Sequence, residues 1–130
     1  MLFRSQEFAE PYDDALRRLL ARAAEDVGIS VVTRGIYGCT QGPRLETSAE
    51  IRRMQRDGCA LVGMTGMPEA ALAREAGIAY ASLSMVVNPA AGLSAAPITM
   101  EAILREAEGC MAKGIRLLSQ TLRLLDQVRG

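Results

Sequence analysis

The sequence of 130 residues contains no histidine and no tryptophan, and its 15 basic residues balance its 15 acidic residues. Without histidine, this chain alone cannot supply an imidazole base, a histidine metal ligand or a Ser-His-Asp triad. A net charge of zero lacks the electrostatic footprint of nucleic-acid binding proteins, so we expect no nucleic-acid partner. The chain is therefore expected to carry part of an active site, or one that works without imidazole.

Cysteines and long apolar runs are also scarce. Cys39, Cys59 and Cys110 are an odd number at wide spacings, which argues against a disulfide framework and against a Cys-x-x-Cys metal site. Apolar stretches stay far below the roughly 20 residues that a membrane helix needs. Residues 1–10 lack the apolar run of a signal peptide. We therefore expect a cytoplasmic protein that binds neither a metal nor a membrane.

The residues that are present predict a packed α/β domain. The composition is 49% hydrophobic and 23% charged, which is typical of a globular chain, and the charge-poor segment 59–100 indicates an interior. Apolar periodicity, prolines, glycines and capping residues predict helices over 11–27, 47–57, 68–76 and 99–128. Strands are expected over 29–37, 59–64 and 78–87. This order predicts a mostly parallel or mixed sheet covered by helices.

The last predicted helix is the longest. Its apolar residues recur at helical spacing and predict one buried stripe, made of Ile103, Leu104, Ala107, Met111, Ile115, Leu118, Leu122 and Leu125.

Three loops follow the predicted strands, at the sheet edge where α/β proteins bind ligands. The loop 38–46 contains Glu46, which is either a ligand-binding group or a solvated acid. The loop 64–68 contains Thr65, which together with free backbone N–H groups either binds an anion or caps the next helix. Asn88 opens the loop 88–92. Its amide either reads the donor–acceptor edge of a planar base or forms a turn before proline.

The motifs in these loops closely resemble the C-terminal half of the purine nucleoside phosphorylase and methylthioadenosine phosphorylase family. They are Gly42-Pro43-Arg44-Leu45-Glu46-Thr47, then Val62-Gly63-Met64-Thr65 with Pro68-Glu69, then Asn88. Within the family, the likeness is greatest to the bacterial S-methyl-5′-thioinosine phosphorylases. The resemblance implies a three-layer phosphorylase/hydrolase-like α/β fold with a mixed central β-sheet flanked by helices. Residues 11–130 would form the C-terminal half of that domain, residues 1–10 are an atypical N-terminal start, and the chain is expected to be truncated.

The resemblance also implies a reaction. In this family inorganic phosphate attacks the anomeric carbon of a purine nucleoside and releases the free base and a ribose 1-phosphate. The sugar becomes cationic and the purine gains negative charge, so the enzyme donates a hydrogen bond at N7 and holds phosphate against the sugar. Phosphate is a co-substrate, and no metal or organic cofactor is expected. Family members are commonly homotrimers, so the resemblance implies a homo-oligomer.

Family roles transfer to five positions in the first, second and third loops. Asn88 matches the catalytic residue that hydrogen-bonds N7 and the 6-substituent, and an amide there favours 6-oxopurines. Glu46 matches the glutamate that accepts from the purine N1–H. Thr65 matches the residue that contacts phosphate, and Met64 matches the methionine beneath the ribose. Leu45 stands where many relatives carry a phenylalanine against the base.

The resemblance implies that the segment 96–100 contacts the 5′ end of the substrate. Plain inosine and guanosine phosphorylases place a histidine there, whereas this segment is apolar and contains Ile98. Ile98 therefore either forms a wall for a 5′-methylthio group, which favours transfer out of water, or anchors the start of the last helix. The expected activity is phosphorolysis of S-methyl-5′-thioinosine or a related 6-oxopurine nucleoside. The alternative is a non-catalytic purine-nucleoside-binding or subunit-interaction fragment, because the family's main phosphate-binding groups lie in the other half.

Overall fold

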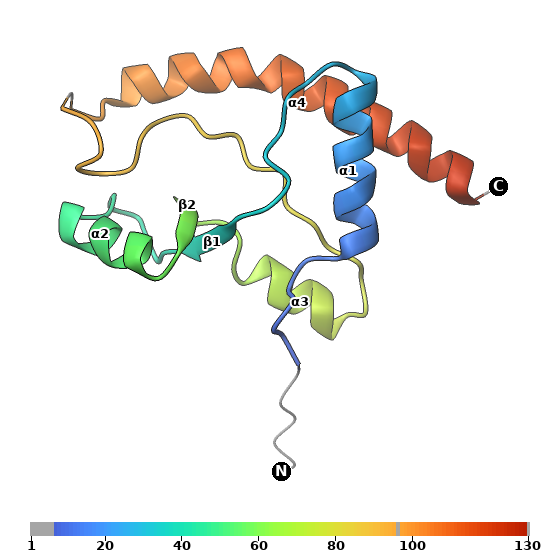
Figure 1. The fold of residues 1–130 in the computed structure, drawn as a ribbon, viewed down its shortest axis with the longest axis horizontal. Coiled ribbons are helices and arrows are strands. Elements are labelled where there is room, and N and C mark those ends of the chain that lie inside the picture. Colours follow the sequence, from blue (N-terminus) through green and yellow to red (C-terminus); the bar gives the residue numbers. More distant parts are fainter. Residues whose placement is uncertain (1–6, 96, 130) are drawn as a thin grey trace, which may run out of the picture.

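The computed structural model describes residues 7–95 and 97–129. It is an α/β structure whose described residues form a small parallel sheet and four helices (Figure 1). In chain order the elements are α1 (Asp14–Asp26), β1 (Ile36–Cys39), α2 (Ser48–Arg56), β2 (Cys59–Gly63), α3 (Glu69–Glu75) and α4 (Met100–Arg129). All four predicted helices are thus confirmed, with small differences at their ends.

The starts of α1 and α2 are capped by side chains. Asp13 caps α1 by accepting from the backbone N–H of Leu16. At α2 the Thr47 hydroxyl accepts from the Glu50 N–H, and the Glu50 carboxylate accepts from the Thr47 N–H at 2.7 Å. These bonds satisfy backbone donors that have no partner inside the helix. The sequence predicts this capping box, because Glu50 follows Thr47 by three residues, and the structure confirms it.

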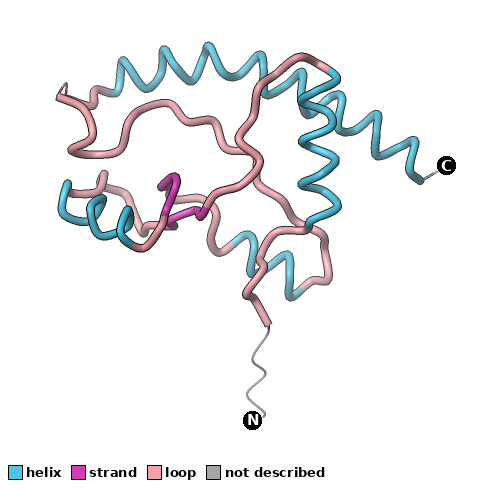
Figure 2. The backbone as a smooth tube through the Cα atoms, viewed as in Figure 1, coloured by secondary structure: helices cyan, strands magenta, loops and turns pink. Residues whose placement is uncertain are grey.

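The sheet is smaller than predicted. β1 and β2 pair in parallel, with Cys39 opposite Gly63 at their carboxyl ends, which confirms the strand predicted over 59–64. The strand predicted over 29–37 is wrong over most of its length, because only its last residues pair. The strand predicted over 78–87 is also wrong, since this segment is a loop (Figure 2). A strand requires a neighbouring strand for its backbone N–H and C=O groups, and among the described residues neither 29–35 nor 78–87 has one.

The hydrophobic core lies between α1 and α4 (Figure 1). Ala23 and Ala24 of α1 are fully buried against Leu117 of α4, whose side chain is 2% exposed. The small alanine side chains allow the two helices to approach closely. Gln120 on α4 also donates to Asp26 on α1 at 3.1 Å, so this contact joins residues 94 positions apart.

The predicted stripe on α4 is wrong for most of its members. Its exposed residues are Leu104, Met111, Ile115, Leu118 and Leu122. The buried face is rotated around the helix and contains Leu117 and Thr121. Apolar residues occur on both faces, so helical periodicity alone did not identify the face that contacts α1. No helix in the described ranges is long and apolar enough to cross a membrane.

The chain exposes an unusually large surface for its mass. Its accessible surface is 9835 Å², whereas a folded monomer of 14.0 kDa typically exposes roughly 6,700 Å². The accessible surface therefore exceeds the typical value by about 3,000 Å². The exposed face of α4 contributes to this excess. The chain therefore has far more uncovered surface than a self-sufficient domain of this size.

Candidate functional site

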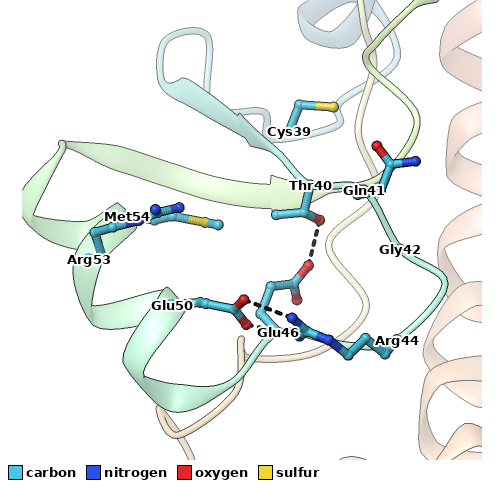
Figure 3. A pocket seen from close by; sticks show the side chains of 9 residues that line it. All are labelled: Cys39, Thr40, Gln41, Gly42, Arg44, Glu46, Glu50, Arg53 and Met54. Carbon is cyan, nitrogen blue, oxygen red and sulfur yellow. Dashed lines mark hydrogen bonds and ion pairs between the residues drawn. The ribbon is translucent and has the colours of Figure 1, made fainter.

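The first candidate site is the loop after β1. Thr40 follows the last residue of β1, and its backbone N–H donates to the Gly63 carbonyl at the end of β2 at 2.9 Å. The Thr40 hydroxyl donates to Oε1 of Glu46 at 2.6 Å. Both residues line a cavity of about 280 Å³ (Figure 3). Glu46, a candidate residue from the sequence, is therefore held beside the carboxyl end of the sheet through Thr40.

An ion pair closes one side of this cavity. The Arg44 guanidinium donates to both carboxylate oxygens of Glu50, at 2.8 and 2.9 Å (Figure 3). The hydrogen bonds from Arg44 and then from Thr47 lower the pKa of Glu50 to about 2, from an ordinary value of 4.5. Because Arg44 is engaged with Glu50, Glu46 has no arginine partner at hydrogen-bond distance in the described chain.

Met64 and Thr65 lie on the adjacent loop after β2. The Met64 side chain packs on Gly42, where a β-carbon would lie 2.6 Å from the methionine sulfur. Gly42 has a φ of +61°, a conformation that glycine adopts without strain. Thr65 is exposed, and its backbone N–H donates weakly to the Tyr37 hydroxyl at 3.4 Å. The structure thus places Met64 against the Glu46 loop and leaves the Thr65 side chain accessible.

Asn88 and Ile98 line a second cavity, of about 570 Å³. Its other walls include Val86 and the first turns of α4, with Ala102 and Ile103. Asn88 Nδ2 donates to the carbonyl of Pro89 at 2.8 Å, so one amide N–H is engaged within its own loop. The amide has two N–H donors, so the second remains for an acceptor on a bound base.

The loop that begins at Asn88 packs against the start of α2. A β-carbon on Gly92, in the loop that begins at Asn88, would lie 2.5 Å from the Oγ of Ser48. Ser48 is the first residue of α2, two positions after Glu46. The third loop therefore lies against the start of α2, beside the loop that carries Glu46.

The structure groups the predicted residues in two sets. Glu46 lies at the first cavity with Met64 on the neighbouring loop, while Asn88 and Ile98 share the second cavity. Leu45 is 49% exposed and lines neither cavity. Sequence reasoning missed Thr40, because a single hydroxyl in a glycine-containing loop carries no recognisable spacing. Its position directly after a strand end was the available signal.

This arrangement defines an α/β protein whose candidate ligand site is built from the two loops that follow β1 and β2 and from the loop that begins at Asn88. Solved structures share this fold. Methylthioadenosine phosphorylase from Schistosoma mansoni, in complex with adenine, superposes with a TM-score of 0.90 at 25% sequence identity. The superposition covers 95% of this chain and 49% of that chain.

Sequence comparisons identify the family. A family model described as the Phosphorylase superfamily matches residues 3–123, so the chain belongs to the phosphorylase superfamily. A probable S-methyl-5′-thioinosine phosphorylase from Pseudomonas syringae is 54% identical over 116 residues, covering 89% of this chain and 47% of that protein. A probable 6-oxopurine nucleoside phosphorylase from Moorella thermoacetica is 45% identical, covering 75% of this chain and 38% of that protein. The chain thus spans about half the length of the curated relatives it matches, or less.

Proposed function

We propose that this chain forms the purine-reading part of a nucleoside phosphorylase that cleaves S-methyl-5′-thioinosine, or a related 6-oxopurine nucleoside, with inorganic phosphate. The products are the free base and a ribose 1-phosphate, 5-methylthioribose 1-phosphate for the methylthio substrate. The observation that carries the proposal is the 54% identity with a probable S-methyl-5′-thioinosine phosphorylase over nearly the whole chain. The positions of Glu46 and Asn88 in adjoining loops support it.

Glu46 and Asn88 are assigned to the base. A 6-oxopurine presents an N1–H donor, which a carboxylate accepts, and O6 and N7 acceptors, to which an amide donates. In phosphorolysis the base leaves with increasing negative charge, so a donor at N7 stabilises the transition state more than the bound substrate. Asn88 is the catalytic residue in this assignment, and Glu46 orients the base.

The sugar and phosphate are assigned to the remaining residues. Met64 lies against the Glu46 loop, and its flexible apolar side chain suits the ribose face. The exposed Thr65 hydroxyl is assigned to phosphate. Ile98 is assigned to the 5′-methylthio group, since it lines the cavity that contains Asn88. Leu45 is assigned to a wall against the base, although it lines neither of the two cavities described above.

The reaction is tested by measuring hypoxanthine release from S-methyl-5′-thioinosine with and without phosphate. Phosphate-dependent release by the chain supports the proposal, and release without phosphate contradicts phosphorolysis. Asn88→Asp tests the base assignment, because an aspartate suits a 6-amino group and removes the amide donor. We expect the ratio of hypoxanthine to adenine affinity to fall about ten-fold, the effect of one hydrogen bond. An unchanged ratio would contradict the role of Asn88.

A second candidate is a non-catalytic purine-binding or subunit-interaction fragment. The exposed surface favours it, because the excess of about 3,000 Å² relative to a typical monomer is larger than one side of a standard protein interface. The apolar side chains on the outer face of α4 contribute to this surface. Hypoxanthine binding without phosphate-dependent turnover would favour this candidate. Turnover by the purified chain, at a rate proportional to its concentration, would exclude it.

A further inference from the structure

We propose that Thr40 is the residue that positions Glu46 for reading the purine N1–H. This inference deepens the proposed function and rests on it for the identity of the base. The inference rests on the Glu46 carboxylate, because its two oxygens have different surroundings.

Oε1 of Glu46 is occupied by the Thr40 hydroxyl at 2.6 Å. The same hydroxyl lies 3.4 Å from the Gly63 carbonyl, but it has one proton to donate, and the shorter, charged acceptor is the stronger partner. Oε2 accepts no hydrogen bond within residues 7–95 and 97–129. Oε2 is therefore the oxygen left for a donor on a bound base.

Thr40 is itself fixed by the sheet. Its backbone N–H donates to Gly63 at the end of β2 at 2.9 Å, which extends the β1–β2 pairing by one bond. A β-branched side chain so close to a strand has few rotamers. The Thr40 hydroxyl therefore holds Glu46, a loop residue, in a fixed position relative to the sheet. Without this bond, a glutamate in a loop would occupy several rotamers.

The neighbouring charges leave this role to Thr40. Arg44 is the cation nearest in sequence to Glu46, and both of its terminal guanidinium nitrogens donate to Glu50. Nη1 also donates to the Leu45 carbonyl at 3.1 Å. If Arg44 paired with Glu46 instead, the carboxylate would be neutralised and covered. The Arg44–Glu50 pair thus leaves the Glu46 carboxylate available to accept from the purine. Among the described residues, Thr40 supplies the only hydrogen bond to the Glu46 carboxylate.

The decisive variants are Thr40→Val, which keeps the shape and removes the hydroxyl, and Thr40→Ser, which restores the hydroxyl. The first measurement uses the chain without ligand, with NMR side-chain couplings reporting the rotamers of Glu46. We expect one rotamer in the wild type and in Thr40→Ser, and averaged rotamers in Thr40→Val. A single rotamer in Thr40→Val would overturn the inference. If Thr40→Val fails to fold, Thr40→Ala provides the same comparison.

The second measurement compares binding of hypoxanthine and 1-methylhypoxanthine, which lacks the N1–H. We expect Thr40→Val to reduce the preference for hypoxanthine about ten-fold, with Thr40→Ser close to the wild type. Equal losses for both bases would indicate general damage and would overturn the positioning role. If the wild-type chain binds neither base, the proposed function of this chain fails, whereas the ligand-free rotamer measurement still decides whether Thr40 fixes Glu46.

Discussion

Replacing Leu117 by alanine should remove a large part of the stability of the chain. Leu117 is 2% exposed and is the one large side chain in the buried cluster with Ala23 and Ala24. The substitution deletes three carbon atoms, worth about 2.4 kcal/mol in transfer free energy at about 0.8 kcal/mol each. The two alanines cannot extend into the space, so a cavity term adds to this value. We expect a total loss of about 3 kcal/mol.

Leu118→Ala is the matched control, since Leu118 is the next residue of α4 and is 49% exposed. The assay is urea unfolding followed by circular dichroism at 222 nm. We expect the control to change the unfolding free energy by no more than about 0.5 kcal/mol. Equal effects of the two variants would refute the α1–α4 core. If Leu117→Ala is unfolded at all concentrations of urea, Leu117→Met provides a milder change of less than about 1.5 kcal/mol.

Two further predictions concern the Glu46 loop. The folded-state pKa of Glu50 is about 2, below its ordinary 4.5, so the Arg44 pair stabilises the fold fully above about pH 4.5 and its contribution disappears as the pH falls toward 2. Thermal unfolding midpoints should fall over this range, and Arg44→Gln should flatten the fall; an equally steep fall would contradict it. Gly42→Ala should cost more than about 1 kcal/mol, because φ is +61° and the Met64 sulfur occupies the space. Adding Met64→Ala should recover only part of this loss, and full recovery in urea unfolding would exclude backbone strain as a cause.

The sequence was most informative where the determining interactions are local. Asp13, Thr47 and Glu50 lie within a few residues of the backbone groups they bond, so the helix starts could be predicted. The loop 78–87 was mistaken for a strand, because apolar composition reports burial propensity but not the presence of a neighbouring strand. On α4, apolar residues lie on both faces, so the sequence could not show that Leu117 is buried and Leu118 is exposed.

The same distinction between local motifs and contacts between distant segments applies to the candidate site. The motifs around Glu46 and Asn88 could be identified because their residue types and spacing are specific. The bond from Thr40 to Glu46 and the separation of Glu46 and Asn88 into two cavities depend on how the three loops pack. The contact of Gly92 with Ser48, far apart in the chain, is an example that no local pattern encodes.

The 30 residues of α4 make one rod about 45 Å long, and its first turn and its middle make different contacts. Ile103, near its start, lines the cavity of Asn88 and Ile98, whereas Leu117 forms the core with α1. Occupancy of the cavity and integrity of the core are therefore thermodynamically linked. A ligand that binds only the folded chain raises its melting temperature, and a core substitution weakens the apparent affinity by the fraction of molecules it unfolds. Affinity measured in a core variant is consequently a measure of folding as well as of recognition.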